Sequence, residues 1–145
     1  MITAIFVILI MASIGTLVLS LSSKSLKATS AQYQRAQAAL YAKSYTEFAV
    51  LAVTGHDRSS DCVEDIGATI GSPTTGNGYR VRTHIAYIGP NSEIGNCSST
   101  RQLSTNVTTK QTPLTLIIDA YVDYKDPDNT AGPWMTVHRR TVQKI

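Results

Sequence analysis

The sequence predicts an α+β fold in which one long N-terminal α-helix, first membrane-spanning and then amphipathic, packs on a small antiparallel β-sheet. Two patterns predict this class. Neither Gly nor Pro occurs between Thr16 and Thr54, which favours an uninterrupted helix. Apolar and polar residues alternate in segments 79–88 and 114–124, which indicates strands with one buried face. The apolar side of the helix and the apolar face of the sheet each need to be buried. Packing one on the other makes a two-layer domain.

The first part of the helix is apolar on every side. Residues 1–21 contain no charged side chain, and a helix of that length extends about 30 Å, the thickness of a bilayer's hydrocarbon core. The first helix-ending residue is Gly55, so we expect one continuous helix of roughly 54 residues. We therefore assign 1–22 as a hydrophobic transmembrane segment and 23–145 as a globular head.

The second part of the helix is one-sided. From Ser22 to Thr54, apolar and aromatic residues recur mainly at steps of three, four and seven, which predicts a single stripe facing the sheet. The residues of this predicted stripe are Leu26, Tyr33, Ala36, Leu40, Tyr41, Tyr45, Phe48, Leu51 and Ala52.

The rest of the chain supplies three or four strands. Glycines predict a loop over 56–78, and weak β character falls at 103–109. The clear strands are 79–88 and 114–124, in which Leu114, Leu116 and Ile118 begin the buried face. A turn at 126–133 then leads to a returning strand at 134–142.

Composition excludes several function classes. The net charge of +3 is too small to dictate a nucleic-acid partner. Segment 71–78 spaces two glycines as a phosphate-binding loop does, but the required Lys-Ser/Thr is absent, so a turn is expected. The three histidines have no evident nucleophile beside them. We expect no catalysis, no cofactor and no metal site, with calcium at the acidic turn 126–129 as an open alternative.

Two cysteines, Cys62 and Cys97, lie in polar surroundings. An even count in an apparently exported chain favours one disulfide over two free thiols. That bond would close a loop of about 35 residues and stabilise the fold by roughly 3–4 kcal/mol.

The start of the chain is unusual for a targeting segment. No basic residue precedes the apolar span, whereas Lys24, Lys27 and Arg35 follow it, and this charge distribution would leave the head in the cytoplasm. Cysteine usage indicates export instead. Both observations agree if a short basic leader has been removed, which makes Met1 a processed N-terminus.

The long helix, apolar at first and then packed on a sheet, resembles the type IV pilins and the pseudopilins of type II secretion. The resemblance covers the whole chain in architecture and residues 1–55 in sequence pattern. It implies cleavage of a leader by a prepilin peptidase, methylation of Met1, residence in the bacterial inner membrane, and assembly by dedicated machinery into an extracellular helical homo-oligomer. It also implies a variable region bounded by Cys62 and Cys97.

Two positions depart from the family pattern. Most members carry Glu at mature position five, where this chain has Ile5, and many carry Pro where Ser22 stands. Either the chain is a tip or minor subunit, or its assembly relies on packing alone.

The apolar segment is the expected polymerisation core. Outside lipid it would expose about twenty apolar side chains, and burial against sister copies recovers roughly 25 cal/mol per Å². Small residues would permit close helix approach. The core residues are Ala4, Ile5, Phe6, Ile8, Leu9, Ala12, Gly15, Leu17 and Leu19.

Two alternatives remain open. One is a minor pilin or pseudopilin acting in DNA uptake, adhesion or secretion, with a candidate anionic-ligand patch of Arg80, Arg82, Arg139 and Arg140. A solvated sheet face explains these arginines more simply, so nucleic acid is the weaker expectation. The other is a membrane-anchored periplasmic domain.

Overall fold

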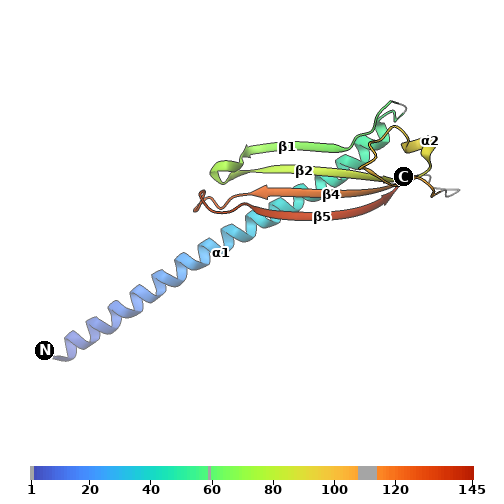
Figure 1. The fold of residues 1–145 in the computed structure, drawn as a ribbon. Coiled ribbons are helices and arrows are strands. Elements are labelled where there is room, and N and C mark those ends of the chain that lie inside the picture. Colours follow the sequence, from blue (N-terminus) through green and yellow to red (C-terminus); the bar gives the residue numbers. More distant parts are fainter. Residues whose placement is uncertain (1, 59, 108–113) are drawn as a thin grey trace. The chain divides into compact units, whose positions relative to one another are not determined.

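The computed structural model describes residues 2–58, 60–107 and 114–145 and gives two compact units, residues 1–36 and 37–145, which are described separately. The helices are α1 (Ile2–Gly55), the 3-10 turn η1 (Pro73–Thr75) and α2 (Asn91–Ile94). The strands are β1 (Asp65–Ser72), β2 (Asn77–Ile88), β3 (Gln102–Ser104), β4 (Thr115–Tyr124) and β5 (Met135–Lys144) (Figure 1). The predicted α+β class, a long N-terminal helix packed on a small and mainly antiparallel sheet, is confirmed.

The first unit contains only the first part of α1, up to Ala36. The predicted continuity is confirmed, because α1 passes Ser22 without a break and ends at Gly55. Hydroxyl groups within the apolar segment are satisfied locally: Ser13 donates to the Ile10 carbonyl and Thr16 to that of Ser13. Such bonds keep polar atoms paired where the surrounding side chains are apolar.

The second unit contains the sheet, with strand order β1-β2-β4-β5 and antiparallel pairing along this path. The short β3 pairs in parallel with the end of β2, beyond the point where β1 stops. The strands predicted at 79–88, 114–124 and 134–142 are confirmed to within two residues. The weak strand expected at 103–109 is reduced to β3, and residues 108–113 lie outside the described part of the chain.

The predicted loop at 56–78 is wrong, because β1 occupies its second half. Strand β1 pairs with β2 through a hairpin in which Gly71 and Gly76 have φ of 66° and 77°. Glycine adopts this left-handed backbone at little cost, so these residues mark the ends of a tight turn. The alternation of Ile66, Ala68 and Ile70, each half-buried, is the strand signal that the glycines obscured.

The helix face that packs on the sheet differs from the predicted stripe. The buried positions are mostly small, namely Ala38, Ala42, Thr46, Ala49 and Val53, with Tyr41 and Tyr45 half-buried at the edge. Tyr33, Leu40, Phe48 and Leu51 are exposed, and the side chain of Leu26 is not described. Small helix residues leave room for large strand side chains, so burial here follows shape complementarity between the two layers.

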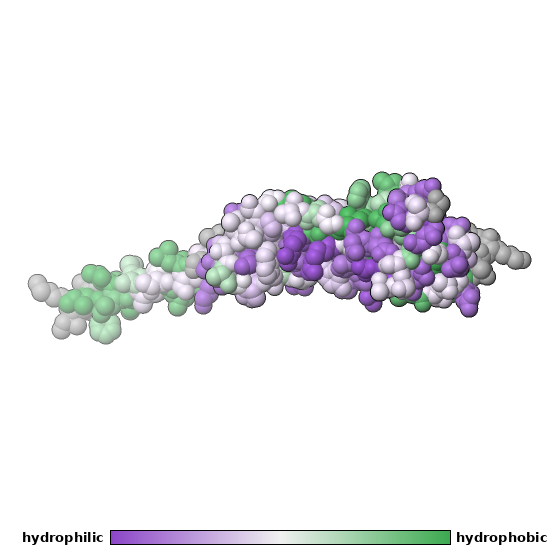
Figure 2. Space-filling model, turned by 45° about the horizontal axis from the view of Figure 1, so that its top comes forward, coloured by the Kyte–Doolittle hydropathy of each residue, from purple (hydrophilic) through white to green (hydrophobic). Residues whose placement is uncertain are grey.

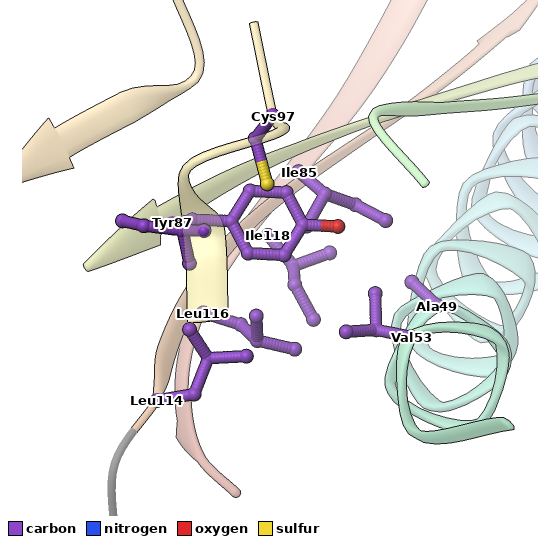
Figure 3. Packing of buried hydrophobic residues seen from close by; sticks show 9 residues of the cluster. Ala49, Val53, Ile85, Tyr87, Cys97, Leu114, Leu116 and Ile118 are labelled. Atoms are coloured by element: carbon purple, nitrogen blue, oxygen red, sulfur yellow. The ribbon is translucent and has the colours of Figure 1, made fainter. Parts of the chain in front are cut away.

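The core between α1 and the sheet has two clusters. One gathers Ala49 and Val53 of the helix with strand residues such as Ile85, Leu116 and Ile118 (Figure 3). The other, nearer the start of the unit, gathers Ala38 and Ala42 with Tyr79, Val81, Ala120, Val122 and Tyr124. The inward face predicted for segment 114–124 is confirmed, because every second residue from Leu114 to Tyr124 is buried.

The Cys62–Cys97 disulfide is present as predicted. Beside it, the Glu64 carboxylate accepts hydrogen bonds from the Ser98 backbone N–H and hydroxyl, both at 2.6 Å. The Tyr87 hydroxyl donates to the Val63 carbonyl, and burial together with the Glu64 charge raises the pKa of Tyr87 to about 12. These contacts attach the segment after α1 to the end of β2.

Candidate functional site: an apolar helix and a charged sheet face

The apolar start of α1 has no covering surface within the described structure. Its large side chains between residues 5 and 21 are 53–73% exposed: Ile5, Phe6, Val7, Ile8, Leu9, Ile10, Met11, Ile14, Leu17, Val18, Leu19 and Leu21. Figure 2 shows apolar residues over most of the visible surface of this segment. Such continuous apolar exposure marks a membrane or protein contact.

This segment contains the predicted polymerisation core. Ile5, Phe6, Ile8, Leu9, Leu17 and Leu19 are exposed. Ala12 is exposed as well, and a Cβ added at Gly15 would meet no atom within 4 Å. Met1 and the side chain of Ala4 lie outside what the structure describes. The mean hydropathy of the segment's most apolar stretch is 2.5, so α1 is long and apolar enough to span a membrane.

A second apolar strip lies on the part of α1 that belongs to the head. Leu40, Ser44, Phe48 and Leu51 follow one another at steps of three and four, and the three large side chains are 52–67% exposed. Two shallow depressions of about 280 and 180 Å³ adjoin this strip and meet at Ser44. Since the opposite face of the helix covers the sheet, this strip is free for another partner.

The outer face of the sheet is charged and organised in rows across the strands. One row places Asp65 of β1 beside His84 of β2, and Arg101 donates to the same carboxylate at 2.7 Å. Burial of Asp65 opposes its ionisation, but the hydrogen bonds from His84 and Arg101 outweigh it and lower the pKa of the carboxyl.

Asp119 of β4 is paired with two groups of β5. Arg140 Nε and Nη2 donate to its two oxygens, both at 2.8 Å, and His138 Nε2 lies 2.7 Å from Oδ1. The Arg140 hydrogen bonds are the main reason that the pKa of Asp119 is lowered, with His138 adding to them. Arg140 is thereby neutralised within its own row.

Asp123 of β4 is the most buried of these carboxylates, with a side chain 2% exposed. Both Arg80 and Arg82 donate to its Oδ2, and Thr136 donates to Oδ1 at 2.7 Å. Burial opposes ionisation of Asp123, yet the Thr136 and arginine contacts prevail and lower its pKa.

The structure therefore brings together only part of the predicted arginine patch. Arg80 and Arg82 converge on Asp123, whereas Arg140 binds Asp119 in another row. Arg139 pairs in register with Ala120, a buried inward residue, so it lies on the opposite side of β5 from Arg140.

Sequence reasoning missed the residues that organise this face. Asp119 and Asp123 were not singled out from the sequence, although their alternation with Tyr121 in a strand next to arginine-bearing strands was the available signal. Tyr121 stacks on His138 with ring centroids 4.4 Å apart, and the Arg80 guanidinium lies 4.7 Å from the Trp134 ring centroid.

A third feature is a polar pocket of about 320 Å³ at the end of α1, lined by residues that include His56, Arg58 and Glu93. Arg58 donates to the Val53 carbonyl, near the end of α1, and to the Glu93 carboxylate of α2. Within the described residues, no group of three or more His, Cys, Asp or Glu is placed to hold a metal ion.

No protein-family model matches the chain, and comparisons with curated proteins and with solved structures yield no match.

Proposed function

We propose that this chain is the structural subunit of an extracellular, type IV pilus-like filament, polymerised through the apolar start of α1. The observation that supports the proposal most strongly is the continuity of α1. One helix carries a fully apolar segment long enough for a membrane and then continues as the packing element of a small head. A plain anchor needs only the first of these parts.

The subunit would remain in the bacterial inner membrane until assembly machinery withdraws it. Its apolar segment would then exchange lipid for neighbouring copies, because leaving these side chains in water is unfavourable. The strip of Leu40, Phe48 and Leu51 is a separate exposed apolar surface, within the head. Met1 would be the processed and methylated first residue.

The test replaces Gly15 by Leu in cells that assemble the chain. The site is open within the isolated chain, so this variant should insert and fold normally. Added bulk at a close helix contact should nevertheless block packing between copies. We expect surface-sheared filaments to be lost while the membrane-bound amount stays unchanged. The matched control is Leu19→Met, which conserves volume and should leave assembly intact.

Mass spectrometry of sheared material supplies an independent readout. An N-methylated Met1 in fibres supports the proposal. An uncleaved leader on a detergent-extracted monomer, with no fibres from the unmodified chain, overturns it in favour of a single-pass membrane anchor.

A further inference from the structure

We propose that Arg80 and Arg82, held on the outer sheet face by Asp123, form a binding site for the carboxylate groups of an acidic polysaccharide. This inference is independent of filament assembly, since all three residues lie within the head.

The two arginines present the same edge to Asp123. Arg80 uses Nε and Nη2, at 3.1 and 3.0 Å from Oδ2, and Arg82 uses Nε and Nη2, at 3.1 and 2.9 Å from the same oxygen. A guanidinium has five N–H donors, so the Nη1 end of each group still has donors to offer. The side chains of Arg80 and Arg82 are 45% and 49% exposed, so about half of each remains in contact with solvent beside the ion pair.

Charge at this position is unbalanced. Two guanidinium groups share one carboxylate, and the other Asp123 oxygen accepts from the neutral Thr136. A ligand carboxylate that bridges the two Nη1 ends would neutralise the remaining positive charge. Hydrogen bonds between a guanidinium and a carboxylate are charge-assisted and are therefore stronger than those between neutral groups.

The site is also preorganised. The Arg80 guanidinium lies over the Trp134 ring at 4.7 Å, and that of Arg82 lies 5.8 Å from the Tyr121 ring centroid. Each arginine is thus held by both a carboxylate and an aromatic ring. Because little side-chain freedom remains to be lost, ligand binding costs less conformational entropy than at a free surface arginine.

The surroundings favour a polysaccharide over a nucleic acid. Trp134 is already contacted by Arg80 and by Lys125, and Tyr121 is stacked on His138, so these rings are not free platforms for bases. Asp65 and Asp119 lie on the same face and would disfavour the closely spaced phosphates of a nucleic-acid backbone more than widely spaced carboxylates. A uronic-acid polymer separates its carboxylates by hydroxyl-bearing rings, and these hydroxyls can donate hydrogen bonds to the Asp65 and Asp119 carboxylates of the sheet face.

The experiment measures binding of polygalacturonate to the full-length chain in detergent, with neutral dextran and duplex DNA as comparison polymers. We expect Arg80→Gln and Arg82→Gln each to weaken binding about tenfold, the usual effect of losing one charged hydrogen-bonding group. Arg82→Lys should also weaken it, because lysine keeps the charge and the partner Asp123 but lacks the second donor end. The control Arg139→Gln removes the same charge from the other side of β5 and should change affinity less than twofold.

Thermal unfolding of every variant verifies that the head is folded. If a glutamine variant does not fold, the binding measurement on Arg82→Lys tests the proposal in its place. The proposal is overturned if polygalacturonate binds no better than dextran, or if Arg139→Gln weakens binding as much as Arg80→Gln. Tighter binding of duplex DNA than of polygalacturonate would also overturn it and would assign the site to a nucleic acid.

Discussion

Arg80 of β2 and Asp123 of β4 are direct cross-strand partners, and Arg80 Nη2 lies 3.0 Å from Asp123 Oδ2. This pairing buries a carboxylate on the side of the sheet that faces away from the helix. The outer face of the sheet therefore contains ion pairs that join strands β2, β4 and β5. These ion pairs should affect the stability of the head.

The first consequence is acid sensitivity. The pKa values of Asp65, Asp119 and Asp123 are all lowered from 3.8. A carboxyl with a lower pKa in the folded state binds fewer protons there than in the unfolded chain. Its stabilising effect is therefore complete above 3.8 and is lost as the pH falls through the folded-state value. We expect the free energy of unfolding to be level between about pH 5 and 7 and to fall below about pH 4.

Asp123→Asn tests the origin of this effect. The variant should be less stable at pH 7 and should lose less stability on acidification, as followed by denaturant unfolding of the full chain in detergent. The matched control is Asp128→Asn in the exposed β4–β5 turn, which should keep the wild-type pH dependence. An unchanged acid profile in Asp123→Asn would contradict this account.

The second prediction concerns the disulfide. Cys62 and Cys97 are separated by 35 residues, so replacing both by Ser should lower the free energy of unfolding by about 3–4 kcal/mol. Denaturant titration measures the loss. A reductant should reproduce it in the wild type and have no further effect on the double variant; equal stability of the two proteins would show that the bond is dispensable.

The third prediction distinguishes the two faces of α1. Ala42 is fully buried against the sheet, so Ala42→Leu should destabilise the head by about 1–3 kcal/mol through overpacking. Leu40, two residues earlier, is 64% exposed, and Leu40→Ala should change stability by less than about 0.5 kcal/mol. Thermal or denaturant unfolding measures the stability of both variants. A larger loss of stability in Leu40→Ala than in Ala42→Leu would show that the predicted stripe, and not the small-residue face, packs on the sheet.

The fourth prediction concerns the β1–β2 hairpin. Gly76 has φ of 77°, and a Cβ there would lie 2.4 Å from the Pro127 Cα, so Gly76→Ala should cost about 1–3 kcal/mol. Gly67 in the adjoining strand is the control, because its nearest neighbour would be the Val81 carbonyl at 4.0 Å. Unfolding measurements that rank the two alanine variants equally would exclude strain in the turn.

Local patterns were sufficient wherever the structure depends on neighbouring residues in the chain. Helix hydrogen bonds join residues four apart, so the absence of Gly and Pro between Thr16 and Thr54 predicted an unbroken α1. The alternation in 114–124 likewise predicted β4 and its buried face, because successive strand side chains point to opposite sides.

Only the tertiary structure decided which surfaces meet. Leu40 and Phe48 had the stronger apolar signal, yet Ala38 and Ala42 cover the sheet, since large strand residues leave room for small helix ones. The convergence of Arg80 and Arg82 on Asp123 depends on strand order and register, which join residues about forty positions apart. Hydrophobicity and spacing specify the elements of this protein; the fit between layers and the order of the strands determine its exposed helix strip and its charged face.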